Sequence, residues 1–258
     1  MHMPLFAANI TTMFQELPMS ERVQAARRCG FAAVEFLLPY EWSLEEIYAW
    51  PEVESVHFIL MNTLPGIDGS PGCAAIPARI NEFRTSFKET LRYMNGLDIG
   101  MVHLMAGKPS ENLPEAESCF VENVRWAADL VPDKIILLEA LNTFDMPDYL
   151  YSMTDHTVSL IERISRPNVK LQFDFYHQQL MEGNLSKTLE KHWKHIGHIQ
   201  FSSVPGRNEP QYGEVNVEFL FDWLDEQNYH GWIGCEYKAR KLTPEGLTWG
   251  RRWGLGLE

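Results

Sequence analysis

The chain has 258 residues, 45% of them hydrophobic, and a formal net charge of −13. A chain of about 250 residues with this composition is long enough for one (β/α)8 barrel with a full core. The acidic balance argues against nucleic acid as the main partner, because a phosphate backbone requires basic surface. It does not argue against a small anionic substrate that is bound by one or two local cations.

Strand-like and helix-like stretches alternate along the chain. Strands are expected at Leu5–Ile10, Ala33–Leu38, Ser55–Met61, Met101–Met105, Ile135–Glu139, Val169–Phe173, Ile196–Phe201 and Trp232–Glu236. Amphipathic helices are expected at Met19–Cys29, Leu44–Trp50, Ala78–Asn95, Glu115–Leu130, Thr154–Ile164, Leu185–His192 and Val217–Gln227. In the stretch from Ala78, apolar residues recur at steps of three and four, which is helical spacing. Gly30 and Gly96 follow two of these stretches and are expected to end the helices.

Eight short strands with helices between them predict a parallel sheet, and eight such units close into a TIM barrel. No linker interrupts the alternation, so the prediction is one domain over residues 1–258. An open doubly wound sheet is the alternative. Neither G-x-G-x-x-G nor G-x-x-x-x-G-K-[ST] follows an early strand, so nothing favours a nucleotide-binding fold.

The cysteines are scattered and form no C-x-x-C pair: Cys29, Cys73, Cys119 and Cys235. This spacing favours reduced thiols over a disulfide framework or a structural zinc site. The sequence opens without a signal-peptide pattern, and its apolar runs are too short to cross a bilayer. We therefore expect a cytoplasmic protein without a membrane partner. A homo-oligomer is compatible with the sequence.

Four of the predicted strands end in an oxygen-bearing polar side chain. The strand ends are Glu139 in K-I-I-L-L-E, Asp174 in V-K-L-Q-F-D, Gln200 in H-I-Q and Glu236 in W-I-G-C-E. Burial of an ionised carboxylate without a partner is very costly. The active site of a barrel lies at the carboxyl ends of its strands, which are about 5 Å apart, so one divalent cation can be shared by all four side chains. These oxygen donors favour Mg2+ or Mn2+ over zinc. The alternative is that each acid caps the following helix or pairs with a surface lysine.

Several segments together resemble the hydroxypyruvate isomerase family, which belongs to the xylose isomerase-like barrels. They are F-A-A-N-I (6–10), A-A-V-E-F-L-L-P-Y (32–40), V-H-L-M-A-G (102–107), L-L-E-A-L (137–141), F-D-F-Y-H (173–177), H-I-Q…E-P…G-E (198–214) and G-W-I-G-C-E-Y-K (231–238). The resemblance covers nearly the whole chain. It implies that Glu139 and Glu236 serve as acid and base as well as metal ligands, whereas Asp174 and Gln200 only bind the metal. Many broader sugar epimerases have His where Gln200 stands, and the amide keeps the donor set all-oxygen.

The resemblance implies an aldose–ketose isomerase, an intramolecular oxidoreductase of carbohydrate and glyoxylate metabolism. Its substrate pair would be hydroxypyruvate and 2-hydroxy-3-oxopropanoate (tartronate semialdehyde). Such a reaction moves a proton between adjacent carbons through an ene-diolate. A metal stabilises this intermediate, and two carboxylates serve as acid and base. Two alternatives stay open: an enzyme acting on a longer sugar acid, such as an isomerase or epimerase of 2-oxo-tetronate or a dehydratase, and a non-catalytic carbohydrate-binding barrel. The length of the substrate depends on the loops after Met61, Ala106 and Gln200.

A small hydroxy-oxo acid carries a carboxylate, so its site requires a cation or several donors. Arg207 lies seven residues after Gln200 in the loop S-S-V-P-G-R-N-E-P, and a guanidinium matches a carboxylate with two parallel hydrogen bonds. Its alternative partner is Glu209. Lys238 lies two residues beyond Glu236, and strand alternation places it on the same face.

Three further residues are candidates for contact with the substrate. His177, three residues beyond Asp174, is expected to hydrogen-bond a substrate oxygen or proton, and a structural role is its alternative. His103, at the end of the fourth strand, faces either the site or a neighbouring carboxylate. Glu35 contacts the substrate or makes a structural hydrogen bond. The histidines of a lysine-rich stretch are expected on a solvated surface: His192, His195 and His198.

Overall fold

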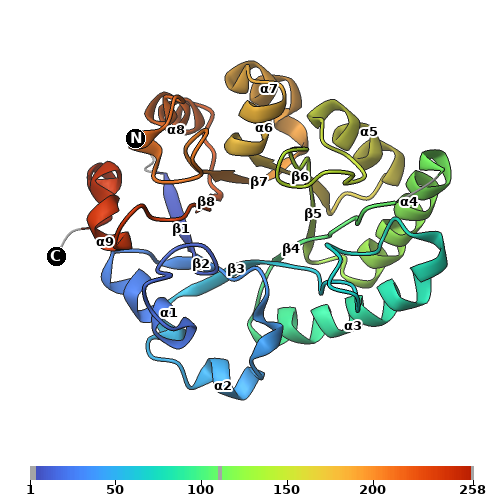
Figure 1. Ribbon diagram of the computed structural model, residues 1–258, viewed down its shortest axis with the longest axis horizontal. Coiled ribbons are helices and arrows are strands. Elements are labelled where there is room, and N and C mark those ends of the chain that lie inside the picture. The colour runs from blue at the N-terminus through green and yellow to red at the C-terminus, as the bar shows by residue number, and fades with distance from the viewer. Residues whose placement is uncertain (1–3, 110–111, 257–258) are drawn as a thin grey trace. The chain divides into compact units, whose positions relative to one another are not determined.

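The computed structural model describes residues 4–109 and 112–256. Within these residues, strands β1 to β8 follow one another in chain order around a closed barrel (Figure 1). The strand pairs β1–β2, β1–β8, β3–β4, β4–β5, β5–β6 and β7–β8 are all parallel. The predicted eight-stranded parallel barrel is therefore confirmed, and the open doubly wound sheet is wrong.

The chain folds into two compact units, whose boundaries fall within β3 and β7. The terminal unit comprises Met1–Ile59 and His198–Glu258, and the central unit comprises Leu60–Gly197. The elements of the terminal unit are β1 (Leu5–Asn9), α1 (Met19–Arg28), β2 (Ala33–Glu35), α2 (Leu44–Tyr48), α8 (Val217–Glu226), β8 (Trp232–Cys235) and α9 (Thr243–Gly246), with 3-10 turns at Pro39–Glu41, Val53–Ser55, Pro210–Tyr212 and Leu247–Trp253. Strands β3 (His57–Asn62) and β7 (Ile196–Phe201) each contribute residues to both units.

In the terminal unit, β1 lies between β2 and β8 (Figure 1). The core around these strands is aromatic. Phe6 on β1 contacts Phe221 of α8 and Trp249 edge to face, with ring centroids 5.1 and 5.2 Å apart. Phe201 on β7 lies 4.9 Å from the ring of Phe221 in the same geometry. Each such edge-to-face pair stabilises the packing by about 0.5–1.5 kcal/mol beyond the burial of its area.

The tight turn after α1 requires glycine. Gly30 has φ +92°, and a Cβ atom there would lie 2.4 Å from the carbonyl oxygen of Gly254. Both the left-handed backbone and the close approach of the chain exclude a larger side chain. The sequence prediction that Gly30 ends the first helix is confirmed, since α1 stops at Arg28.

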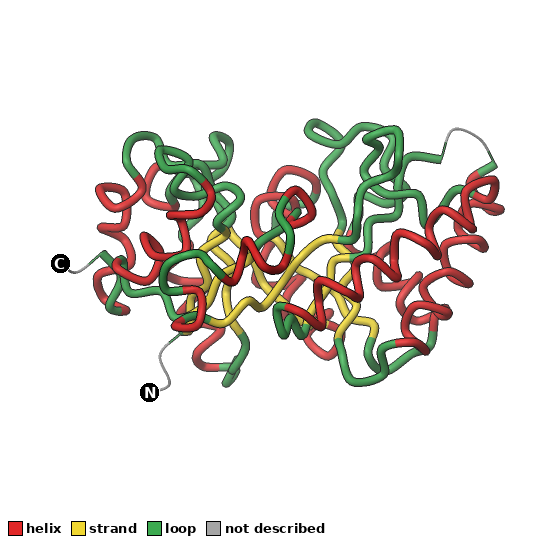
Figure 2. Tube along the Cα trace, turned by 90° about the horizontal axis from the view of Figure 1, so that it is seen from below, coloured by secondary structure: helices red, strands yellow, loops and turns green. Residues whose placement is uncertain are grey.

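The central unit continues the same alternation of strand and helix. Its elements are α3 (Ile80–Gly96), β4 (Met101–His103), α4 (Leu113–Leu130), β5 (Ile135–Glu139), α5 (Thr154–Ile164), β6 (Val169–Asp174), α6 (Phe175–Met181) and α7 (Leu185–His192), with 3-10 turns at Pro77–Arg79 and Trp193–His195. The register pairs His103 with Leu137 and Glu139 with Gln172. In this unit the long loops that follow β3, β4 and β5 lie together on one side of the strands (Figure 2).

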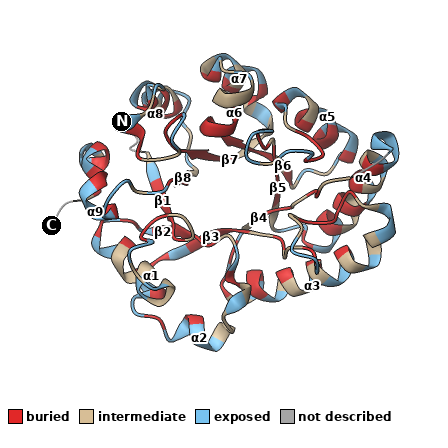
Figure 3. Ribbon diagram, viewed as in Figure 1, coloured by how far each residue is buried: buried red, intermediate tan, exposed pale blue. Residues whose placement is uncertain are grey.

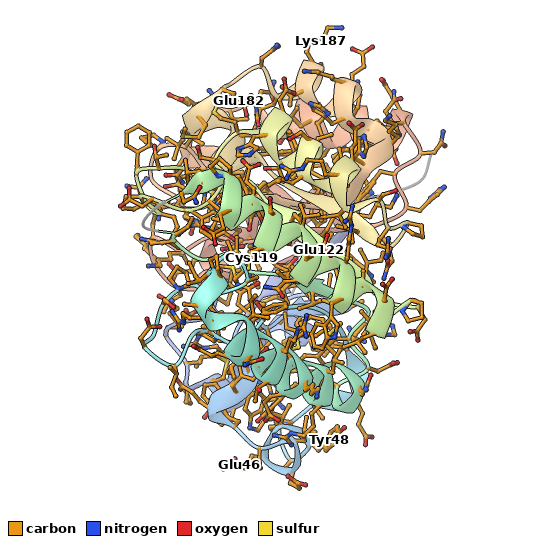
Figure 4. All side chains as sticks on the ribbon, turned by 90° about the vertical axis from the view of Figure 1, so that its right-hand side faces the viewer. Glu46, Tyr48, Cys119, Glu122, Glu182 and Lys187 are labelled. Atoms are coloured by element: carbon orange, nitrogen blue, oxygen red, sulfur yellow. The ribbon has the colours of Figure 1, made fainter. Side chains whose placement is uncertain are left out.

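Helices α3, α4, α5 and α7 of the central unit bury one face each, as their apolar spacing predicts. On α3 the buried residues include Phe83, Phe87 and Met94, and the opposite face is exposed (Figure 3). Glu122, labelled on α4 in Figure 4, is exposed and accepts a hydrogen bond from Arg125 at 2.6 Å. Among the described residues, no helix is long and apolar enough to cross a membrane.

The predicted elements differ from the observed ones mainly at their ends and at two helices, α6 and α9, that the sequence prediction does not contain. Between β6 and α7 no helix is predicted, but α6 begins directly after Asp174. Asp174 initiates it, because its Oδ1 accepts a hydrogen bond from Tyr176 N at 2.7 Å. An acid at a strand end can therefore also be a helix N-cap.

Candidate active site

In the central unit, two carboxylates lie buried at neighbouring strand ends. Glu139 ends β5 and is 4% exposed, and Asp174 ends β6 and is 3% exposed. One donor atom each from Glu139, Asp174 and His177 lies within 4.8 Å of the others. Two ionised carboxylates at this separation repel each other, and burial strengthens the repulsion unless a cation or hydrogen-bond donors compensate it. The two carboxylates, with His177 beside them, therefore form a site that could hold a metal ion.

His177 is oriented by the loop that follows β5. The backbone N–H of Asn142 donates to His177 Nδ1 at 3.0 Å, so this ring nitrogen carries no proton. In the neutral ring the proton is then on Nε2, which lies 3.9 Å from both Glu139 Oε1 and Asp174 Oδ2. A ring nitrogen that carries a proton cannot bind a metal, and a ligating histidine instead donates its other N–H to a partner. The geometry therefore supports His177 as a hydrogen-bond donor beside the two carboxylates and not as a metal ligand.

His103 supports Glu139 from the end of β4. Its Nδ1 lies 3.2 Å from Glu139 Oε2, and burial lowers the pKa of His103 to about 3. The ring is therefore neutral near pH 7 and donates Nδ1–H to the carboxylate. This contact fixes Oε2 and leaves Oε1 on the side of His177. Of the two alternatives that the sequence leaves open for His103, the structure shows the contact with a neighbouring carboxylate.

Asp174 combines two roles through its two oxygens. Oδ1 caps α6, as the bond from Tyr176 N shows, whereas Oδ2 is directed towards His177 Nε2. The helix-capping alternative is thus correct for Oδ1. Oδ2 still belongs to the acidic site with Glu139 and His177.

In the terminal unit, Gln200 and Glu35 form a buried pair. Both are fully buried, and Gln200 Nε2 donates to Glu35 Oε2 at 2.8 Å. The contacts of Glu35 favour the structural hydrogen bond over contact with the substrate. His198 donates to the same carboxylate at 2.5 Å and is also fully buried.

The expectation of a solvated surface is therefore wrong for His198, because the residue lies within β7, which begins at Ile196. His192 is also buried, and its Nε2 lies 2.7 Å from Asp155 Oδ1. His195 is partly buried, with Glu162 Oε1 at 3.3 Å. Each of these rings has an acidic neighbour, which the lysine-rich composition of the stretch does not reveal.

Glu236 and Arg207 form an ion pair in the loops that follow β8 and β7. Arg207 Nη2 donates to Glu236 Oε1 at 2.8 Å, and Glu236 is largely buried. Glu209, the alternative partner of Arg207, instead accepts a hydrogen bond from Arg240 N at 3.1 Å. The backbone of Arg207 has φ +51°, a left-handed conformation that costs energy for a residue other than glycine.

Lys238 is exposed, and its backbone N–H donates to the carbonyl oxygen of Arg207 at 3.0 Å. Because β8 ends at Cys235, strand alternation does not determine the direction of this side chain. The backbone bond nevertheless holds Lys238 beside the loop that carries Arg207.

Sequence analysis did not find the residues that support these side chains. Asn9, at the end of β1, donates to Glu35 Oε2 at 3.1 Å, and a search of every strand end for polar residues would have included it. His198 is two residues before Gln200, and residues at this spacing share one face of a strand. No local pattern marks Asn142, since its role depends on a contact with a helix 35 residues further along the chain.

The structure thus brings Glu139 and Asp174 together in the central unit. In the terminal unit it shows the partners of the other two proposed ligands, Glu35 for Gln200 and Arg207 for Glu236. That all four share one ion stays a prediction.

The fold and the acidic strand ends define a class of protein, the barrel enzymes of the xylose isomerase type. The family model of the xylose isomerase-like TIM barrel matches residues 23–253. A 2-oxo-tetronate isomerase from Pectobacterium atrosepticum is 39% identical over 257 residues, which are 97% of this chain and 98% of that protein. The hydroxypyruvate isomerase of Escherichia coli is 36% identical over 251 residues, covering 95% of this chain and 97% of its own. Among solved structures, a crystal structure of an AP endonuclease of family 2 from Brucella melitensis has a TM-score of 0.94 at 40% identity and covers 97% of this chain and 99% of that one.

The chain belongs to the hydroxypyruvate isomerase family of xylose isomerase-like TIM barrels, and it is an isomerase.

Proposed function

We propose that the protein is a metal-dependent isomerase of a short hydroxy-oxo acid, and that it interconverts hydroxypyruvate and 2-hydroxy-3-oxopropanoate. The buried pair Glu139 and Asp174, with the proton-bearing nitrogen of His177 beside it, carries the proposal. The name of the Escherichia coli relative, hydroxypyruvate isomerase, supports this substrate.

Glu139 and Asp174 would hold a divalent metal ion, and we propose Gln200 and Glu236 as its other ligands. Their places at the ends of consecutive strands support this set, as does the match of donor chemistry to Mg2+ or Mn2+. When bound, the ion would supply Lewis acidity that favours loss of a proton next to the substrate carbonyl.

The protein's own groups then move the proton. One of Glu139 and Glu236 removes a proton from the hydroxymethyl carbon, and an ene-diolate forms. The other glutamate delivers a proton to the adjacent carbon, while the hydroxyl proton passes between the two substrate oxygens. His177 Nε2–H is placed to donate to the oxygen on which negative charge develops. Since the two carbons exchange oxidation states, no external oxidant or reductant is required.

The substrate carboxylate requires a cation, and Arg207 and Lys238 are the proposed partners. Arg207 already lies beside Glu236, at 2.8 Å, and Lys238 is tied to the Arg207 loop through its backbone. A carboxylate that approaches Glu236 would therefore meet the guanidinium first. Arg207 would hold the substrate and also separate its charge from that of Glu236.

A second candidate is the isomerisation of 2-oxo-tetronate, a hydroxy-oxo acid with one more carbon. The relative from Pectobacterium atrosepticum that has this name is 39% identical to the chain, slightly more than the hydroxypyruvate isomerase of Escherichia coli. The chemistry of proton transfer is the same for both acids. The two candidate functions therefore differ only in whether the active site has space for the additional carbon.

A comparison of the two acids tests the proposal. Purified protein loaded with Mn2+ is incubated with each acid, and the product is followed by proton NMR. We expect kcat/KM for hydroxypyruvate to exceed that for 2-oxo-tetronate by at least ~10-fold, the usual discrimination for one carbon. A preference for 2-oxo-tetronate would assign the second function. Conversion of neither acid by the metal-loaded protein would contradict both.

A further inference from the structure

A buried carboxylate lies behind Gln200 in the terminal unit. Gln200 Nε2 donates to Glu35 Oε2 at 2.8 Å, and both side chains are fully buried. A carboxylate accepts hydrogen bonds and cannot donate them when ionised, so only the nitrogen end of the amide can face Glu35. The Oε1 atom of Gln200 is therefore directed away from Glu35, as a metal ligand requires.

Glu35 is itself held rigidly. Asn9 Nδ2 donates to Oε2 at 3.1 Å, and Asn9 is oriented in turn because its Oδ1 accepts from Thr11 N at 3.1 Å. On the other side, a Cβ atom on Gly234 of β8 would lie 2.0 Å from Glu35 Oε1. Glycine at this position thus leaves the space that the carboxylate occupies.

Glu35 accepts a further hydrogen bond from the histidine beside it. His198 Nε2 donates to Glu35 Oε1 at 2.5 Å, and both side chains are fully buried. The carboxylate of Glu35 therefore receives hydrogen bonds from three side chains, those of Asn9, His198 and Gln200.

A carboxylate that accepts from an amide N–H strengthens the carbonyl oxygen of the same amide as an electron donor. Carboxylates behind metal-bound histidines have the same effect, since they fix the ligand and increase its basicity. We propose that Glu35 is a positioning residue that selects the orientation in which Gln200 presents Oε1 to the metal and strengthens that oxygen as a ligand. This inference depends on the proposed function only in that Gln200 is one of the metal ligands.

An exchange of the two groups tests the proposal without reference to turnover. The dissociation constant of Mn2+ is measured by calorimetry and by electron paramagnetic resonance for the metal-free wild type, Glu35→Gln, Gln200→Glu and the double variant. In Glu35→Gln the introduced amide oxygen can still accept the hydrogen bond from Gln200, but the carboxylate charge behind the ligand is lost, and we expect Mn2+ affinity to fall about 10-fold, the lower end of the effect of a partner behind a ligand. In Gln200→Glu, two carboxylates would face each other across the former hydrogen bond, so affinity also falls although a ligand charge is added.

The double variant restores the hydrogen bond with its direction reversed, since the amide introduced at position 35 would donate to the carboxylate introduced at position 200. We expect its Mn2+ affinity to exceed that of each single variant. A role in stability alone predicts instead that the two losses add. Glu209→Gln, which alters a buried carboxylate of the same unit that accepts from Arg240 N, is the matched control and should change Mn2+ affinity less than about 3-fold.

The outcomes separate this inference from the proposed function. If the wild type does not bind Mn2+, both are overturned. If it binds Mn2+ and Gln200→Ala weakens the binding but Glu35→Gln does not, the role of Glu35 alone is wrong. Thermal unfolding of each variant verifies that it is folded. If Glu35→Gln does not fold, Gln200→Glu decides the question, because tighter Mn2+ binding by that variant would contradict the proposal.

Discussion

The two units support their strand-end groups with partners of opposite character. In the central unit the ligand candidate Glu139 is an anion, and a neutral hydrogen-bond donor, His103, lies behind it. In the terminal unit the candidate Gln200 is an amide, and the carboxylate of Glu35 lies behind it as a hydrogen-bond acceptor. Each partner complements its own ligand, so both arrangements leave one oxygen of the ligand directed away from the supporting group.

The difference between the units shows how an amide can take a place among carboxylates. A neutral ligand attracts a divalent cation less than an anionic one, and a carboxylate that hydrogen-bonds to the amide from behind strengthens the amide oxygen as a ligand. The acidic pair of the central unit needs no such addition, but it needs donors that limit its repulsion. These considerations lead to the following expectations.

Removal of the metal should have the largest effect. If both units hold ligands of one ion, treatment with a chelator should abolish turnover, and addition of Mg2+ or Mn2+ should restore it. The assay is product formation from hydroxypyruvate before and after dialysis against the chelator. Full activity in protein shown by elemental analysis to contain no metal would mean that the buried acids have another purpose.

Loss of one proton-transfer group should have the second-largest effect on turnover, after removal of the metal. Glu236→Gln keeps the size of the side chain and an oxygen ligand but removes the base. We expect kcat to fall at least ~10²-fold, the lower end of what general acid–base catalysis provides. Mn2+ affinity should fall much less than kcat, and calorimetry with and without substrate measures it. Near-wild-type turnover would leave Glu139 as the only carboxylate candidate in the chemistry.

Substitution of His177 tests whether this residue donates a hydrogen bond to the substrate or binds the metal. His177→Ala should lower kcat about 10²-fold, as loss of a donor to a developing negative charge does. Its affinity for Mn2+ should stay within about 3-fold of wild type, because Nε2 carries a proton. His192→Ala, which alters a buried histidine of the same unit that pairs with Asp155, is the control. A large loss of Mn2+ affinity in His177→Ala alone would make the residue a ligand.

His103 should have the smallest effect of the four, and mainly on metal binding. His103→Leu removes the donor to Glu139, and we expect Mn2+ affinity to fall about 10-fold, the lower end for a partner behind a ligand. His103→Asn keeps an N–H near the position of Nδ1 and should recover most of the loss. Equal affinities of the Leu and Asn variants would show that packing at this position matters and the hydrogen bond does not.

The sequence was sufficient to predict the barrel and the identity of the strand-end groups. The carboxyl end of a parallel strand has a recognisable pattern, in which an apolar run ends in one polar residue. Four segments show this pattern, and their polar residues are Glu139, Asp174, Gln200 and Glu236. The same pattern led to the correct strands because their hydrophobic runs are nearly continuous.

The supporting residues could not be predicted in the same way. Glu35 and His198 are 163 positions apart in the sequence and meet only because β2 and β7 belong to one folded unit. The tautomer of His177 depends on one backbone N–H in the loop after β5, and loops carry no periodicity from which such a contact could be inferred. Sequence patterns therefore indicated the polar groups at the strand ends, and the structure was required to find what orients them.

The isomerisation of hydroxypyruvate in D2O tests the central claim, proton transfer by paired carboxylates, most directly. Metal-loaded protein is followed by NMR at early times, with chelated protein as the control for spontaneous exchange. The account predicts deuterium from solvent at the carbon that receives the proton and, through the reverse reaction, in the hydroxymethyl group of the remaining substrate. Formation of product that contains only the original substrate hydrogen would indicate a hydride shift and would contradict the roles proposed for Glu139 and Glu236.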